Sequence, residues 1–164
     1  MARVYKYYSE FNENRVPVMI ADKSTAYRVD NRRQFNTQTD MYELGIALNL
    51  DKATEEHAYC ACFNAKLRII GFFEISHGNA TATLVDKRIV FQKALLLGAI
   101  KIALIHNHPS GDITPSDEDI ALTRGIAQGG RLIGITLVDH IILGDRNYFS
   151  FYESMRDCLE EKEA

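Results

Sequence analysis

The chain of 164 residues carries a net charge of −3, which argues against a protein that holds nucleic acid by bulk electrostatic attraction. Its length and its 46% hydrophobic content suffice for one domain with a sizeable core. No stretch approaches the roughly 20 apolar residues of a membrane span, and the N-terminus lacks the apolar core of a signal peptide. We therefore expect a cytoplasmic protein with no membrane association.

Residues 1–54 are predicted to form an N-terminal extension with short strands and a helix. Apolar and aromatic residues at 4–8 and 16–20 favour two strands, paired through a polar turn. Helical spacing of apolar residues predicts a helix over 41–50. Nothing in this region indicates a chemical function.

A hairpin is predicted next, with strands at 58–63 and 67–75. The first strand is small and apolar at every position, so both of its faces should be buried. It contains Cys60 and Cys62, which would share one face too closely to bridge and are expected to be reduced, buried thiols. Glu74, an acidic residue inside the second strand, needs a partner. His57 and His77 each lack a second ligand at short spacing, so neither is predicted to bind metal.

A helix over 86–97 follows, with Asp86 as its N-cap and Gly98 as its C-terminal signal. Its apolar face should pack on the sheet. We expect no catalytic residue in it.

An apolar run at 102–105 then leads to His106 and His108, whose side chains should project from the same face of one strand. Pro109 and Gly111 indicate that this strand ends in a turn. Ser116 and Asp119 read as S-x-x-D, close to a capping box, and predict a helix over 116–128 that ends at Gly129-Gly130. The reversal of the chain could direct Asp119 back at the two histidines.

Two imidazoles and one carboxylate suit a divalent ion such as Zn2+, and a catalytic zinc site keeps a fourth position for water. Each part of the pattern also has a simpler interpretation. A His-x-His pair alone is weak evidence, and Ser116 and Asp119 are fully explained as helix caps. The complete set, on a strand, turn and helix, predicts a metal site.

The remaining residues are predicted to form one long strand or two consecutive strands at 132–143, a last strand at 148–151 and a charged C-terminal tail at 154–164. Asp139 and His140 should face opposite sides of their strand. This polar pair either supports the metal ligands or is a satisfied pair in the core. The exposed last strand permits a homodimer.

The pattern His106-x-His108-Pro109, six residues, Ser116-x-x-Asp119 resembles the JAMM motif of the JAB/MPN metalloproteases. The amino-acid sequence at residues 107–112 and 138–145 is similar to that of the RadC branch of that family. The resemblance covers 55–153 and implies a JAB/MPN fold, which is a mixed α/β domain with a curved mixed sheet flanked by helices. It also implies one Zn2+ per chain, held by His106, His108 and Asp119.

The resemblance further suggests catalytic residues. A metal-activated water needs a base to take its proton. In the resembling family, this base is a Glu at the start of the first strand of the hairpin. Glu56 matches that Glu by its position in the sequence. Glu55 is its neighbour and Glu74 is a rival for the role. The Ser of the motif stabilises an oxyanion in that family, so Ser116 has a catalytic interpretation beside its capping one. Glu74, Asp139 and His140 are expected to have supporting roles.

The function implied is a zinc-dependent metallohydrolase that cleaves peptide or isopeptide bonds in a peptide or protein substrate. One alternative is a DNA-repair-associated role, because the RadC branch carries that label. The net charge and the absence of a helix-hairpin-helix signature in residues 1–54 count against it. The other alternative is a metal-binding scaffold without turnover.

Overall fold

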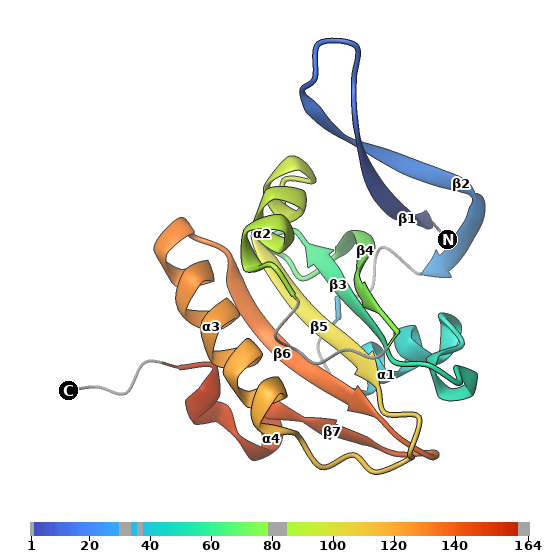
Figure 1. Cartoon of the computed structure of the whole chain (residues 1–164), viewed down its shortest axis with the longest axis vertical. Coiled ribbons are helices and arrows are strands. Elements are labelled where there is room, and N and C mark those ends of the chain that lie inside the picture. Colours follow the sequence, from blue (N-terminus) through green and yellow to red (C-terminus); the bar gives the residue numbers. More distant parts are fainter. Residues whose placement is uncertain (1, 30–33, 36–37, 79–84, 161–164) are drawn as a thin grey trace.

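Seven strands form one mixed sheet in the computed structural model, which describes residues 2–29, 34–35, 38–78 and 85–160 (Figure 1). The strand order is β2-β1-β4-β3-β5-β6-β7. The strands are β1 (Ala2–Phe11), β2 (Pro17–Val29), β3 (His57–Phe63), β4 (Ile69–His77), β5 (Lys101–Asn107), β6 (Thr136–Leu143) and β7 (Tyr148–Ser150). The pairs β5–β6 and β1–β4 are parallel and the others antiparallel. The predicted mixed α/β fold is confirmed.

Helices cover both faces of the central strands. They are α1 (Gln38–Ala47), α2 (Lys87–Leu96), α3 (Asp117–Ile133) and α4 (Phe151–Ser154), with short 3-10 turns at η1 (Leu50–Lys52) and η3 (Arg156–Cys158). Because side chains alternate along a strand, β3 serves both layers. Phe63 packs with Met41 and Leu44 of α1 on one face. Cys60 and Cys62 are free and buried on the other face, which α2 and α3 cover.

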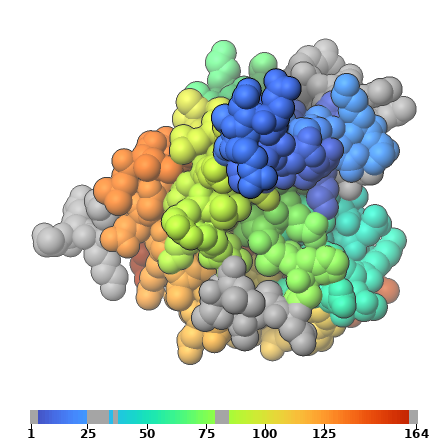
Figure 2. Space-filling model, turned by 45° about the horizontal axis from the view of Figure 1, so that its top comes forward, coloured from blue at the N-terminus to red at the C-terminus, as the bar shows by residue number. Residues whose placement is uncertain are grey.

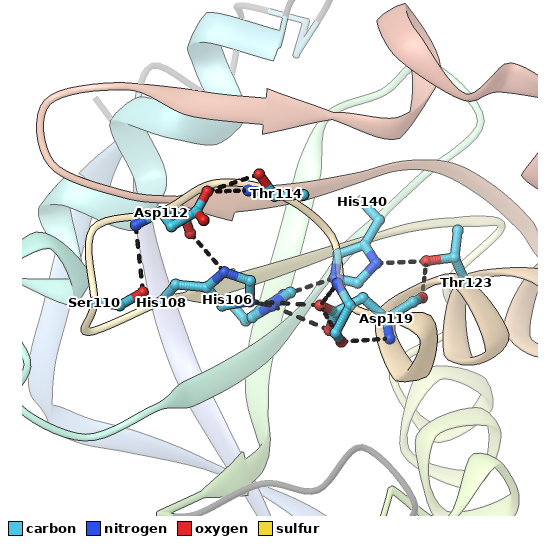
Figure 3. Close-up of polar contacts among 9 residues, drawn as sticks. His106, His108, Ser110, Asp112, Thr114, Asp119, Thr123 and His140 are labelled. Carbon is cyan, nitrogen blue, oxygen red and sulfur yellow. Dashed lines mark hydrogen bonds and ion pairs between the residues drawn. The ribbon is translucent and has the colours of Figure 1, made fainter.

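The helix α3 is the crossover between the parallel strands β5 and β6. Its first turn follows the loop that leaves the end of β5, so the N-terminus of α3 returns to the two histidines (Figures 1 and 3). The hairpin of β1 and β2 joins the sheet through β4 and lies beside α2, as Figure 2 also shows. No helix in the described part of the chain is long and apolar enough to span a membrane.

The end of α3 corrects the prediction. The helix continues through Gly129 and Gly130 to Ile133 and stops at Gly134, whose φ of 76° ends it in the left-handed region. The two earlier glycines are places of close approach, since a Cβ on Gly130 would collide with the carbonyl oxygen of Ile135, and one on Gly129 with the ring of Phe91. The strand predicted from residue 132 therefore begins only at Thr136.

Three smaller predictions can be compared with the structure. Asp86 is the N-cap of α2, as expected, and accepts a hydrogen bond from the backbone N–H of Arg88. The last strand ends at Ser150, because Phe151 already begins α4. The predicted C-terminal tail contains the turn η3, and residues 161–164 lie outside the described residues.

The close approach at Gly130 gives a test of the helix packing. We expect Gly130→Ala to lower the free energy of unfolding by about 1–3 kcal/mol, as overpacking against a backbone atom does. The matched change Gly125→Ala meets only the flexible end of Lys87, so it should gain up to about 1 kcal/mol from helix propensity. Urea denaturation of both variants measures the difference, and equal stabilities would contradict this packing.

Candidate metal centre

His106, His108 and Asp119 converge at the end of β5 (Figure 3). His106 is the next-to-last residue of β5 and is buried, His108 is one residue beyond the strand, and Asp119 is buried in the first turn of α3. The two Nε2 atoms are 3.1 Å apart. Oδ1 of Asp119 is 3.3 Å from Nε2 of His106, and its Oδ2 is 3.4 Å from Nε2 of His108. The structure thus brings together the three residues predicted as ligands.

These separations fit a tetrahedral ion. Bonds of about 2.0–2.1 Å from zinc to nitrogen or oxygen place two ligand atoms about 3.3 Å apart. The donor set of two imidazoles and a carboxylate also suits zinc. The side chains present therefore fit the ion that the motif implies.

The hydrogen-bond partners of His106 determine which of its ring nitrogens carries the hydrogen. The hydroxyl of Thr123 donates to the carbonyl of Asp119 over 2.6 Å, so its oxygen must accept from Nδ1 of His140, 2.6 Å away. Nε2 of His140 then has a free lone pair and accepts a hydrogen bond from Nδ1–H of His106 over 2.8 Å. Nε2 of His106 consequently carries no hydrogen and presents its lone pair to the centre of the site.

His108 also carries its hydrogen on Nδ1, and a single contact determines this. Its Nδ1 lies 2.7 Å from the carbonyl oxygen of Asp112, which can only accept, so Nδ1 carries the hydrogen. The side chain of Asp112 in turn accepts hydrogen bonds from the backbone and hydroxyl of Thr114, which hold the loop. Two lone pairs 3.1 Å apart repel each other, so the site demands a proton or a metal ion between them.

Ser116 orients Asp119. The two residues form a capping box in which Oγ of Ser116 accepts from the backbone N–H of Asp119 over 3.1 Å. The hydroxyl also donates to Oδ2 of Asp119 over 2.6 Å, and the backbone N–H of Ser116 donates to the same oxygen over 2.9 Å. The hydroxyl proton of Ser116 is therefore engaged by the carboxylate that faces the histidines.

The charges of the site favour unprotonated ligands. Burial lowers the pKa of His106 to about 4. Burial alone would raise the pKa of Asp119, but its hydrogen bond with His108 and the charge of His106 hold it well below its usual range. The hydrogen bond to Asp119 raises the pKa of His108, although burial opposes this. Of the three ligands, His108 is thus the one that takes up a proton first.

Glu56 lies beside the three ligands, just before β3. It lines a small cleft together with His106, Asp119 and His140. Burial raises the pKa of its carboxyl group, the charge of His108 lowers it, and that of Asp119 raises it further. Among the described residues, no hydrogen bond engages the Glu56 carboxylate. A carboxylate with a raised pKa beside a metal centre is suited to exchange protons.

Comparison with known proteins identifies the chain. The model of the family described as RadC-like JAB domain matches residues 35–156. The chain belongs to this family. It is 35% identical over 134 residues to a UPF0758 protein of Pelobacter propionicus and 37% identical over 134 residues to one of Methanococcoides burtonii, in each case 82% of this chain and 58% of that protein. It is 44% identical over 99 residues to a UPF0758 protein of Listeria monocytogenes, covering 60% of this chain and 44% of that protein.

The chain thus spans about half the length of these curated relatives. The matched region of the RadC-like JAB domain begins before residue 55, where the resemblance in the sequence begins, and it includes α1. All three residues of the candidate metal centre lie inside it.

His140 contacts a ligand directly, whereas Asp139 does not. Asp139 points to the other side of β6, where its carboxylate accepts hydrogen bonds from the hydroxyl of Ser150 and the backbone N–H of Tyr152. Burial raises the pKa of Asp139 to about 6, although these hydrogen bonds oppose the shift. His140 stacks on Phe151 and bonds His106, as described above. On one face of β6, His140 therefore supports a ligand, and on the other face Asp139 binds the segment around Ser150 and Tyr152.

Glu74 lies away from the three ligands, in the second strand of the hairpin. Its Oε2 accepts from Nζ of Lys6 over 2.7 Å, and its Oε1 lies 2.8 Å from Nδ1 of His57. Burial alone would raise the pKa of Glu74, but these two partners lower it. Its lowered pKa contrasts with the raised pKa of Glu56, so Glu56 is the better placed of the two to act as a base.

Asn107, between the two histidines, is a residue that sequence reasoning missed. Its side chain accepts from the backbone N–H of His57 over 2.9 Å and donates to the carbonyl of Glu55 over 3.0 Å. It thereby holds the two peptide groups on either side of Glu56. A polar residue in an otherwise apolar strand was the available signal, but only the pairing of β3 with β5 shows its partner.

Removing the Asn107 side chain tests this positioning role. Asn107→Ala removes both of these part-buried hydrogen bonds, and we expect each loss to lower the free energy of unfolding by about 0.5–1.5 kcal/mol. The backbone N–H of His57 should exchange faster with deuterium, measured by NMR, while zinc stoichiometry stays the same. Asn107→Asp, which keeps the acceptor for His57, should restore most of the protection. Unchanged exchange in Asn107→Ala would show that Asn107 does not hold this segment.

Zinc affinity should depend on pH through His108. A proton on Nε2 of His108 excludes the ion, and the pKa of this group is raised above 6.5. Below that raised pKa, each further pH unit should weaken zinc binding by about tenfold, because His106 and Asp119 titrate only in stronger acid. Competition with a chelator between about pH 8 and about pH 5 measures this, and a constant affinity would contradict the assignment.

Proposed function

We propose that this RadC-like JAB domain is a zinc-dependent hydrolase that cleaves peptide or isopeptide bonds. The observation that supports this most directly is the convergence of two imidazole lone pairs and the Asp119 carboxylate beside a partly buried Glu56. The substrate we propose is a peptide or protein rather than nucleic acid, because the chain carries a net charge of −3.

His106, His108 and Asp119 would hold the ion. When bound, zinc supplies Lewis-acid chemistry, which lowers the pKa of a water molecule and polarises a carbonyl group. His140 and Asp112 keep both imidazoles in the tautomer that binds through Nε2. Ser116 holds the carboxylate of Asp119 towards them.

Glu56 would act as the proton carrier. It takes a proton from the water molecule that attacks the carbonyl carbon, and it delivers a proton to the nitrogen when the carbon–nitrogen bond breaks. Burial raises its pKa, so this carboxylate holds a proton more readily than an ordinary glutamate and can both accept and release one. The positions of the peptide groups around Glu56 are set by Asn107.

Two serines could stabilise the oxyanion. The hydroxyl of Ser116 would first have to leave Oδ2 of Asp119. Ser76 lines the same cleft as Glu56, and its buried Oγ has no hydrogen-bond partner among the described residues. A buried hydroxyl without a partner is costly unless a ligand satisfies it. Ser76 is therefore a substrate-facing donor that the sequence did not indicate.

Glu56→Gln separates metal binding from turnover. We expect the variant to keep its zinc and to lose about 10²- to 10⁴-fold in rate, since the amide cannot accept the proton. The probes are a tryptic digest of a bacterial lysate and a peptide with a glycyl-lysine isopeptide bond, both read by mass spectrometry for new termini.

Glu43→Gln, an exposed change on α1, is the matched control and should behave as wild type. His108→Ala should lose both zinc and turnover. Cleavage by Glu56→Gln at the wild-type rate would remove Glu56 from the mechanism. A zinc-loaded wild type that cleaves neither probe would favour the scaffold alternative.

A further inference from the structure

A second group of metal-ligating side chains lies where β3 begins and β4 ends. Glu55, His57 and His77 each offer one ligand atom, and these atoms lie within 4.8 Å of one another. His57 and His77 are directly opposite each other in the antiparallel pair. Sequence spacing could not show this, because 20 positions of chain separate two residues that the hairpin makes neighbours.

The two imidazole rings are stacked, with centroids 4.0 Å apart and planes inclined by 30°. Oε2 of Glu55 lies 2.8 Å from Nε2 of His77. An ordinary ion pair explains the contact between Glu55 and His77 by itself. It does not explain why a second imidazole stacks against the first and brings a third ligand atom to the same place.

Glu74 fixes the tautomer of His57. Its Oε1 lies 2.8 Å from Nδ1 of His57, and Lys6 holds its other oxygen at 2.7 Å. A carboxylate paired with lysine accepts a hydrogen bond, so Nδ1 of His57 carries the hydrogen and Nε2 keeps the lone pair. Metal-binding histidines are generally oriented by a carboxylate or carbonyl on their other nitrogen in this way.

We propose that Glu55, His57 and His77 form a second site for a divalent transition-metal ion, with Glu74 as the residue that orients His57. Two imidazoles and one carboxylate favour zinc and its neighbours in the transition series over calcium or magnesium. The side chains of His77 and Glu55 are 56% and 62% exposed, whereas those of His106 and Asp119 are 3% and 6% exposed. This site therefore exchanges its ion with solvent more readily than the buried centre.

The site adjoins Glu56. Because Glu55 and His57 flank Glu56 in the chain, an ion held by both side chains fixes the segment that carries the proposed base. Zinc at this site thus acts on the conformation of Glu56, a consequence that rests on the proposed function. The existence of the site does not.

Zinc binding by four proteins tests the proposal: wild type, His77→Gln, His108→Ala and the double variant. Isothermal titration calorimetry with zinc chloride should give about two equivalents for wild type, about one for each single variant and none for the double variant. In His108→Ala, zinc should also shift the imidazole NMR signals of His57 and His77. Glu43→Gln serves as a control for binding to exposed carboxylates and should match wild type.

The pattern of results separates the two sites. About one equivalent in wild type that persists in His77→Gln and disappears in His108→Ala would overturn the second site and leave the first. About one equivalent in wild type that persists in His108→Ala and disappears in His77→Gln would support the second site and refute the first. His77 is exposed, so its replacement should leave the fold intact, which circular dichroism checks.

Discussion

Two imidazole lone pairs that face each other across 3.1 Å are the constraint on which the candidate site depends. Neither histidine can turn its hydrogen inward, because each donates from Nδ1 to a fixed acceptor. For His108 the acceptor is a backbone carbonyl. For His106 it is His140, whose own state is fixed through Thr123 by another backbone carbonyl. This arrangement suits a cation, and the other nitrogen of each imidazole is held by a hydrogen bond.

The fold brings residues from four separate segments to this centre. β5 supplies both histidines, and the crossover α3 returns Asp119 to them in its first turn. β6 adds His140 from the neighbouring parallel strand, and β3 brings Glu56 from the other side. Asn107 ties that last element to the histidine strand. Four separate segments therefore meet at one end of the central strands, and each is held by backbone hydrogen bonds.

The sequence predicted much of this arrangement because its signals are local. The ligand motif lies within one strand, turn and helix, so the spacing of His106, His108 and Asp119 suffices to suggest their convergence. The capping box at Ser116 is local as well. What the sequence could not show depends on pairing between distant segments. Asn107 acts on residues about fifty positions earlier, and His57 meets His77 only through the hairpin.

The end of α3 illustrates the same limit in another form. Two consecutive glycines are a reasonable signal for the end of a helix, but Gly129 and Gly130 serve close packing against Phe91 and Ile135. Alternation along the strand predicts that Asp139 and His140 face opposite sides, but only the tertiary structure shows that the Asp139 carboxylate accepts hydrogen bonds from Ser150 and Tyr152. Tertiary neighbours decide such cases, and periodicity alone carries no information about them.

The most direct test of this account is the protonation state of the ring nitrogens, read by long-range nitrogen–proton NMR of the histidines. Above the pKa of His108, the zinc-free protein should show hydrogen on Nδ1 and none on Nε2 for both His106 and His108. Addition of zinc should then shift the Nε2 signals of these two residues. Hydrogen on either Nε2, or loss of the Nδ1 hydrogen when zinc binds, would contradict the arrangement described above.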